Sequence, residues 1–393
     1  MARILLANEF GDGFGHARRL LAVARELAAR GHECLFALRD PVATWPVLGG
    51  SSFPILQAPY VVPLQREAWQ DRTIAAYGDI LAGMGFDDPE RLQAMLAAWD
   101  SLLALLNPDL VIADFAPLLC LTLYPARALL LLGNGFTLPP SHLPQFPKLR
   151  EADPLVREDT LLASIALVQR RRGQPFLPSL PALLSAQGHF ITTLPELDPY
   201  AVLREGRSAS PLHPLPPSVP VAEATDDYFA YLSANYAGTA MVIEALARSG
   251  LRGSIYLRDA DAAARESWRR RGLQIHENPV DLPAAVAGAA LTIHHGGPAT
   301  METALAIGRR QLLVPRHFEQ TLYAREALGL RVAVAMKPHG KFDQRHAAAA
   351  LRVIAGDATA AQAASDFADE LAARGPTLAS LPAVLDACAA LLH

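Results

Sequence analysis

Between Leu291 and Gly308 a short apolar segment is interrupted by two histidines and two glycines and then continues as a helix-compatible segment. A strand, a glycine turn and a helix in this order are typical of an α/β protein. The first backbone N–H groups of such a helix have no intrahelical partner and carry about half a positive charge. Because glycine lets a ligand approach the backbone closely, Gly296 and Gly297 predict a binding site for a diphosphate.

Polar side chains around this turn strengthen the prediction. His295 offers an imidazole N–H to the anion, and Thr300 in the first helical turn offers a hydroxyl. We therefore expect the phosphates to be surrounded by the consecutive residues Gly296, Gly297, Pro298, Ala299 and Thr300, together with His295.

A second apolar segment, Gln311 to Pro315, predicts the next buried strand of the same sheet. The following helix would begin at the same edge of the sheet and carries Glu319 and Gln320 in its first turn. A carboxylate and an amide at that position are suited to binding sugar hydroxyls.

The spacing of these residues resembles the donor-binding signature of the UDP-glycosyltransferase superfamily, and in particular of its bacterial members that act on macrolides and other natural products. Counted from the signature histidine without a gap, the matching positions are His295, Gly297, Thr300, Gly308, Pro315, Glu319 and Gln320. Six further matches within twenty-six residues make this pattern specific. The resemblance implies the GT-B fold, an α/β architecture of two Rossmann-like doubly wound domains that face each other across a cleft.

The match has two departures. The usual Gly-Val-Pro of the family is Gly308-Arg309-Arg310 here, and the acidic residue that many members place on the ribose falls at Thr303. His294 is an alternative phosphate-binding histidine, although the ungapped count favours His295. Only a proline recurs at the nucleobase-binding loop, and this weak match places Val280 beside the base.

The N-terminal part begins with another strand, glycine-rich turn and helix. The turn from Gly11 to His16 lacks the third glycine of a dinucleotide-binding fingerprint, which argues against NAD or FAD. Gly15-His16 resembles the superfamily motif in which the histidine is the catalytic base and the glycine lies next to the donor. A histidine that only caps the helix is the structural alternative.

The apolar segment from Leu110 to Ala113 predicts a buried parallel strand that ends at Asp114. Parallel sheets bind ligands at the carboxyl ends of their strands, so Asp114 and His16 should share one edge. In the superfamily an aspartate at this position pairs with the catalytic histidine. Capping of the following helix is the structural alternative for Asp114.

The pattern of strands and helices predicts an N-terminal acceptor-binding domain over residues 1–203 and a C-terminal donor-binding domain over 223–375. Residues 204–222 are rich in proline and serine and read as a linker. The apolar helical face of residues 376–393 would pack back on the first domain, or form a dimer contact. The segment from residue 40 to 88 is expected to be loop-rich and to shape the acceptor pocket.

Composition limits the functional classes. A net charge of −4 gives no basic surface for nucleic acid. Cys34, Cys120 and Cys388 lack metal or disulfide spacing, which indicates a reducing compartment and a cytoplasmic protein. The longest apolar tract, residues 110–133, is broken by charged residues and prolines, so no transmembrane helix is expected; peripheral membrane contact stays open. A monomer and a homodimer are both compatible with the sequence.

These observations lead us to expect an inverting, metal-independent glycosyltransferase with His16 and Asp114 as the catalytic dyad and no cofactor. The donor would be a UDP- or dTDP-type nucleotide sugar, and the acceptor a small or lipid-like molecule. Asp259-Ala260-Asp261 resembles the metal-binding motif of other glycosyltransferase folds, but its place between a strand and a helix favours helix capping. A nucleotide-sugar 2-epimerase of the same fold and a non-catalytic nucleotide-sugar-binding protein are the alternatives.

Overall fold

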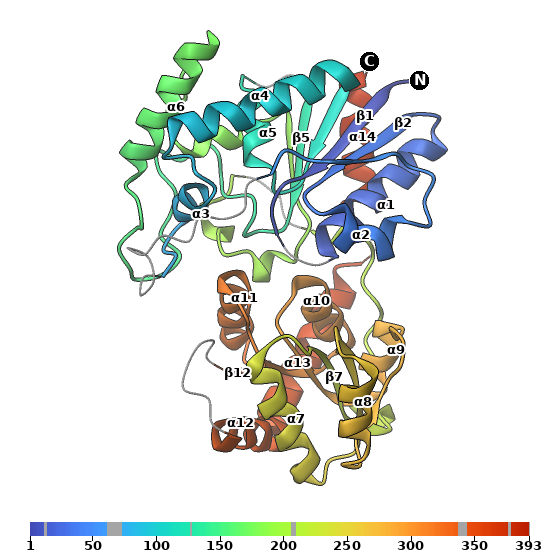
Figure 1. Ribbon diagram of the computed structural model, residues 1–393. Coiled ribbons are helices and arrows are strands. Elements are labelled where there is room, and N and C mark those ends of the chain that lie inside the picture. Colours follow the sequence, from blue (N-terminus) through green and yellow to red (C-terminus); the bar gives the residue numbers. More distant parts are fainter. Residues whose placement is uncertain are drawn as a thin grey trace. The chain divides into compact units, whose positions relative to one another are not determined.

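The computed structural model describes residues 1–11, 14–60, 73–125, 128–205, 210–336, 344–375 and 379–392. The chain divides into two compact units (Figure 1). Unit 1 comprises residues 1–195, 200–212 and 380–393, and unit 2 comprises residues 196–199 and 213–379. The change from unit 1 to unit 2 after Leu212 falls within the segment expected to be a linker, of which residues 206–209 lie outside the described residues.

Unit 1 is built on a six-stranded parallel sheet of order β3-β2-β1-β4-β5-β6. Its strands are β1 (Arg3–Asn8), β2 (Glu33–Leu38), β3 (Ile55–Gln57), β4 (Leu110–Ala113), β5 (Leu129–Gly133) and β6 (Gly188–Ile191). Side chains that point to either face of the sheet are buried along β1 and β4, which shows that both faces are covered. Such two-sided burial is the reason these strands are continuously apolar rather than alternating.

One face of this sheet packs against helices α1 (Gly15–Ala29) and α14 (Leu381–Leu392). Ile4 and Leu6 of β1 belong to the same apolar cluster as Leu20 of α1 and Leu385 of α14. The last helix of the chain therefore contributes to the core of the first unit, although nearly 170 residues of unit 2 separate it from the preceding unit 1 segment (Figure 1).

The other helices of unit 1 are α2 (Pro41–Leu48), α3 (Tyr77–Gly83), α4 (Pro89–Leu106), α5 (Pro117–Thr122) and α6 (Glu158–Arg172), with short 3₁₀ turns at Pro181–Leu184 and Ala201–Leu203. The expectation that residues 40–88 form loops is thus partly wrong, since α2, β3 and α3 lie within them. These elements are too short for a clear periodic pattern in the sequence. A proline inside α2 weakens its helical pattern further. Residues 61–72 of this segment lie outside the described residues.

Unit 2 contains a second six-stranded parallel sheet, of order β12-β11-β10-β7-β8-β9. Its strands are β7 (Asp226–Ser233), β8 (Gly253–Arg258), β9 (Gln274–Ile275), β10 (Ala289–His294), β11 (Arg310–Leu313) and β12 (Ala333–Ala335). Its helices are α7 (Ala237–Ser249), α8 (Ala262–Arg269), α9 (Leu282–Ala287), α10 (Pro298–Ile307), α11 (Phe318–Gly329), α12 (Gln344–Gly356) and α13 (Ala358–Ala373). The strands predicted at Leu291 and over Gln311–Pro315 occur as β10 and β11, with boundaries shifted by one or two residues.

Both sheets have the same connectivity. Numbered within its own unit, each sheet has the order 3-2-1-4-5-6, in which the chain reverses direction across the sheet between the first and fourth strands. Loops that leave these two strands diverge, and the crevice between them is where doubly wound sheets bind ligands. The ligand sites of this protein are therefore expected beyond the ends of β1 and β4 in unit 1 and of β7 and β10 in unit 2.

Arg309 stands where the superfamily pattern Gly-Val-Pro has its valine, and its side chain has a structural role in unit 2. Its guanidinium is fully buried and donates hydrogen bonds to the carbonyls of Val219 (2.6 Å), Ala287 (2.8 Å) and Ile307 (3.3 Å). Ala287 and Ile307 end α9 and α10, and carbonyls at helix C-termini have no intrahelical partners. The cation thus caps two helices and holds the chain at Val219.

We expect Arg309→Met to destabilise the protein by about 2–4 kcal/mol, because the carbonyls of Val219 and Ala287 lose a charged donor while most of the side-chain volume is kept. Chemical denaturation followed by circular dichroism would measure the loss. Arg310→Met is the matched control, since Arg310 is only partly buried and makes one long contact of 3.4 Å. Equal losses for the two variants would contradict the capping role.

Candidate functional site

His16 and Asp114 meet in unit 1, at the crevice that the strand order predicts. His16 is the second residue of α1, just after the loop from β1, and Asp114 directly follows β4. The imidazole Nδ1 lies 2.9 Å from Oδ1 of Asp114, and the carboxylate is completely buried. Because an ionised carboxylate can only accept, Nδ1 carries the proton and Nε2 is left with a lone pair.

The backbone of Asp114 is held by β1. Its N–H donates to the carbonyl of Ala7 (2.9 Å), and its carbonyl accepts from the side-chain amide of Asn8 (2.9 Å). Asn8 also donates to the carbonyl of Phe10 (2.7 Å), so the two loops of the crevice are tied together. Asn8 was not predicted as a site residue, because its contact with Asp114 joins positions 106 residues apart.

Arg19 is a third member of this cluster, and the sequence analysis missed its role. Its guanidinium donates to Oδ2 of Asp114 at 2.5 Å. Burial alone would raise the pKa of Asp114, but Arg19 and then His16 outweigh it and hold the pKa below its ordinary value. The spacing His16 to Arg19 places both side chains on one face of α1, which is the signal that could have revealed the arrangement.

Gly11 lies directly against the imidazole. Its backbone is left-handed (φ 91°), and a β-carbon there would come within 2.2 Å of Nε2 of His16. Glycine at this position therefore keeps the base nitrogen accessible. Gly15, the glycine expected at the donor, begins α1, and no atom lies within 4 Å of the position its β-carbon would take.

Aromatic rings enclose the dyad. The ring of Phe115 lies 6.0 Å from that of His16, and the rings of Phe10 and Tyr77 lie 5.4 and 6.0 Å from Phe115. Phe115 has left-handed backbone (φ 52°), a strained conformation for a bulky residue that the surrounding contacts must enforce. The aromatic ring of Phe115 therefore lies beside the imidazole of His16.

The anion site expected in unit 2 has the predicted local structure. After β10, Gly296 adopts a left-handed conformation (φ 83°), and a β-carbon there would lie 3.3 Å from the carbonyl oxygen of Gln320. Gly297 is the N-cap of α10, and the space where its β-carbon would point is open. Pro298 occupies the first helical position, where its missing N–H costs nothing. The N–H groups of Ala299 and Thr300 follow in the first turn.

Both ring nitrogens of His295, the histidine expected to contact the phosphates, have partners within unit 2. Its Nε2 accepts from the backbone N–H of Ser233 (2.8 Å), and its Nδ1 donates to the carbonyl of Val314 (2.7 Å). These partners use both ring nitrogens, so the imidazole has no N–H left for a phosphate in this arrangement. Burial lowers the pKa of His295 to about 3, which keeps the ring neutral. His295 instead connects the ends of β7, β10 and β11.

His294, the alternative, is also occupied. Its Nδ1 accepts from the N–H of Gly296 (3.0 Å), which leaves Nε2 to donate to the side-chain oxygen of Gln311 (2.8 Å). The ring is buried, and burial lowers its pKa to about 4. Neither histidine therefore offers a donor to an anion, and the groups that remain are the backbone N–H groups of α10 and the buried hydroxyl-bearing Thr300.

Glu319 and Gln320 lie in the first turn of α11, where they were expected. The side-chain oxygen of Gln320 accepts from the backbone N–H of Arg316 (2.9 Å), so the orientation of the buried amide is defined. Its NH₂ group is the part that remains to donate to a ligand. Val280 follows β9 and packs against the apolar cluster of α9 and α10.

Asp259 and Asp261 act in local structure. Oδ1 of Asp261 accepts from the N–H of Ala264 (2.7 Å) and caps α8, and Oδ2 of Asp259 accepts from Ser233 (2.9 Å) and Arg258 (3.0 Å). Within the described ranges, no three histidine, cysteine or carboxylate side chains are grouped so that they could hold a metal ion.

Comparison with known proteins agrees with the fold described above. Residues 277–393 match the family model "Erythromycin biosynthesis protein CIII-like, C-terminal domain". A search of the curated proteins found no significant match. Among solved structures, the spinosyn rhamnosyltransferase SpnG complexed with thymidine diphosphate has 19% sequence identity and a TM-score of 0.63, with 98% of this chain and 100% of that chain covered.

Two further structures have the same fold over nearly the whole chain. The calicheamicin glycosyltransferase CalG4 has 16% identity and a TM-score of 0.68, with 99% of each chain covered. The glycosyltransferase SnogD from Streptomyces nogalater has 17% identity and a TM-score of 0.59, covering 100% of this chain and 99% of that chain. The predicted α/β fold of GT-B type is confirmed.

The C-terminal family match and the shared GT-B fold together support a relationship to the UDP-glycosyltransferase-like superfamily. They also support a glycosyltransferase. No helix among the described residues is both long and apolar enough to span a membrane.

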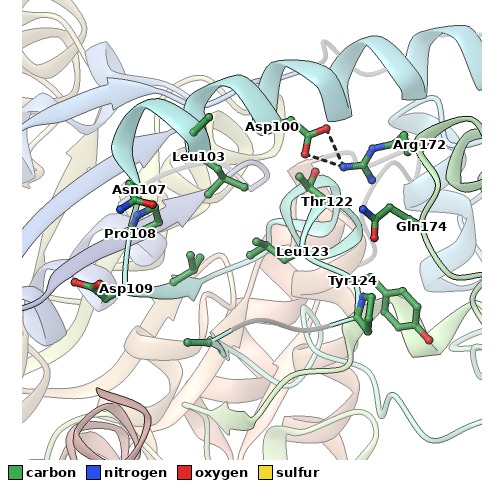
Figure 2. Close-up of a pocket in the computed structure, with 14 residues that line it drawn as sticks. Asp100, Leu103, Asn107, Pro108, Asp109, Thr122, Leu123, Tyr124, Arg172 and Gln174 are labelled. Atoms are coloured by element: carbon green, nitrogen blue, oxygen red, sulfur yellow. Dashed lines mark hydrogen bonds and ion pairs between the residues drawn. The ribbon is translucent and has the colours of Figure 1, made fainter. Parts of the chain in front are cut away.

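Unit 1 also contains a cavity of about 540 Å³ that is separate from the dyad. Figure 2 shows two of its lining residues, Asp100 and Arg172, joined by two contacts of 2.8 and 2.9 Å. Asp109 and Ala128, which also line it, precede β4 and β5, so the cavity lies at the amino ends of these strands. The dyad lies at the carboxyl ends, and the cavity is therefore not part of that site.

The neutral histidines of unit 2 make its stability depend on pH. In the unfolded chain His294 and His295 would protonate near 6.5, whereas the folded state keeps them neutral down to about 4 and about 3. The unfolded state thus binds more protons, and stability should fall as the pH decreases from 6.5 toward 4. We expect the Tm of His295→Asn to change less than that of the wild type over this range.

Scanning calorimetry at several pH values would measure the dependence. His213→Asn is the control because His213 is exposed, and its pH dependence should match that of the wild type. If His295→Asn kept the full acid sensitivity and instead lost affinity for a nucleoside diphosphate, His295 would be a phosphate ligand after all.

Proposed function

We propose that the protein is an inverting, metal-independent glycosyltransferase that moves a sugar from a nucleoside-diphosphate donor to a hydroxyl of a small or lipid-like acceptor. The observation that carries the proposal is the buried contact between His16 and Asp114 at the crevice of unit 1. An alcohol is too weakly acidic to attack a sugar at neutral pH, and histidine is the side chain whose ordinary titration suits a base there.

The state of Asp114 favours inversion. A retaining enzyme that works through a covalent intermediate needs a nucleophile, but both oxygens of Asp114 are bound, one to His16 and one to Arg19. The carboxylate is therefore available to orient the imidazole and to stabilise its protonated form, as in other histidine–aspartate pairs. Direct attack by the deprotonated acceptor is a single displacement, which inverts the anomeric carbon.

Unit 2 would bind the donor. Negative charge builds up on the departing diphosphate, and N–H groups at the start of α10, with Thr300, could stabilise it there. Gly296, Gly297, Pro298 and Ala299 would surround the phosphates, Glu319 and Gln320 the sugar, and Val280 the base. SpnG was solved with thymidine diphosphate, which supports a dTDP- or UDP-type donor for this chain as well. No further cofactor enters this scheme.

The first prediction tests the metal independence. If helix-terminal N–H groups stabilise the diphosphate, transfer activity should survive exhaustive EDTA treatment. The rate of nucleoside-diphosphate release in the presence of acceptor would be compared before and after chelation. Loss of activity that Mn²⁺ restores would contradict the proposal and return Asp259 and Asp261 to consideration.

The second prediction tests the base. His16→Ala should leave donor affinity nearly unchanged and slow transfer to an alcohol by about two to four orders of magnitude. A nitrophenol acceptor is already partly ionised at neutral pH and should recover much of this loss. Asp114→Asn should cost no more than His16→Ala, and the double variant little more than His16→Ala alone, since the pair acts as a unit.

The ratio of wild-type to variant rate, measured for the alcohol and for the nitrophenol, tests whether His16 removes the acceptor proton. His213→Ala, at an exposed position, is the control for nonspecific effects. Equal ratios for alcohol and phenol, with donor binding intact by calorimetry, would mean that His16 does not remove the acceptor proton. Epimerisation of the nucleotide sugar without any acceptor would indicate the 2-epimerase, and donor binding without turnover the non-catalytic protein.

A further inference from the structure

Arg19 is a partly buried charged residue that the proposed reaction does not itself require. It lies on α1 three residues after His16, and its side chain is only 11% exposed. Its guanidinium binds Oδ2 of Asp114, while the imidazole of His16 lies against Oδ1. One carboxylate with no solvent exposure is therefore divided between a permanent cation and a titratable base.

The permanent positive charge of Arg19 stabilises the ionised form of Asp114. An ionised carboxylate without solvent is costly unless a charge or hydrogen bonds compensate it. While the imidazole is neutral, His16 supplies only a hydrogen bond, and Arg19 supplies the positive charge. Since arginine stays protonated at all relevant pH values, Asp114 can remain ionised whether or not His16 carries a second proton.

We infer that Arg19 is a positioning residue, which aims Asp114 at Nδ1 of His16 and opposes the protonation of Nε2. This inference rests on the proposed role of His16 as general base. By binding Oδ2, Arg19 leaves Oδ1 to the imidazole and so fixes the tautomer with the proton on Nδ1. Its charge also repels a positive charge on the imidazole at the same carboxylate, which opposes the addition of a proton to Nε2.

Among the described residues, the other ionisable groups considered near this cluster do not change charge between pH 5 and 7. Burial raises the pKa of Glu9, at the end of β1, to about 8, against the N–H groups of Leu118 and Leu119 that lower it. Burial also raises the pKa of Tyr77 on α3 and of Cys120 on α5. Arg39, after β2, is a permanent cation that donates to the carbonyl of Gly11 (3.0 Å). The acidic limb of the pH profile should therefore report on His16, Asp114 and Arg19.

The test is the pH dependence of kcat/KM. Arg19→Gln removes the repulsive cation, so the acidic limb should move to higher pH by about one unit or more, the effect expected of a unit charge at this range. Asp114→Asn should move it in the opposite direction. Arg19→Lys keeps the charge and should leave the limb near that of the wild type.

The neighbouring Arg18 provides the matched control. It is exposed, with its guanidinium 5.9 Å from the ring of Phe14, and Arg18→Gln makes the same change in net charge. Its acidic limb should coincide with that of the wild type. A purely structural role of Arg19 would lower the rate at every pH without moving the limb, and that result would overturn the inference.

Two further measurements keep the inference testable. If Arg19→Gln does not fold, the double variant Arg19→Met with Asp114→Asn removes both charges together. The acidic limb of its kcat/KM profile should lie at higher pH than that of Asp114→Asn alone. Nitrogen-15 NMR titration of His16 in the free protein needs no activity and should show the Nδ1–H tautomer and the same shifts. An inactive wild type would contradict the proposed function, whereas an imidazole titration that Arg19→Gln leaves unmoved would contradict the role of Arg19.

Discussion

The pairing of β1 with β4, and of β7 with β10, determines where this protein can bind ligands. Each pair lies where the chain reverses its direction across a parallel sheet, so the loops that follow the two strands diverge. The segments after β1 and β4 carry His16 and Asp114, and the turn after β10 carries the glycines that precede the first turn of α10. The neighbouring strands β2, β5 and β11 bury side chains of both faces and support these segments.

Much of this arrangement could be predicted because it is local in sequence. An apolar segment, a glycine turn and a helical pattern identify β10 and α10, and the same pattern identifies β1 and α1. The carboxylate after a buried parallel strand placed Asp114 at the correct edge. These predictions need only periodicity and turn chemistry, which neighbouring residues encode.

What could not be predicted depends on partners far along the chain. Arg309 is explained by carbonyls 22 and 90 residues away, so no local pattern reveals that it caps α9 and α10. His295 matched the superfamily signature, yet its ring is used by Ser233, 62 residues earlier, and by Val314. Arg19 is the intermediate case: its spacing from His16 is visible, but its contact requires Asp114 from a distant strand.

The contrast between His16 and His295 shows how surroundings decide the use of one residue type. Two backbone partners occupy both nitrogens of His295, and burial keeps it neutral, so it can only hold strand ends together. His16 has one nitrogen bound to a carboxylate, and Gly11 leaves the other accessible. On the proposed function, the phosphate-binding part of the donor site in unit 2 would then rely on backbone dipoles and a hydroxyl, which do not titrate. The pH dependence of transfer would arise in unit 1. There Asp114 binds the imidazole of His16, which can gain a proton, and the guanidinium of Arg19, which stays protonated.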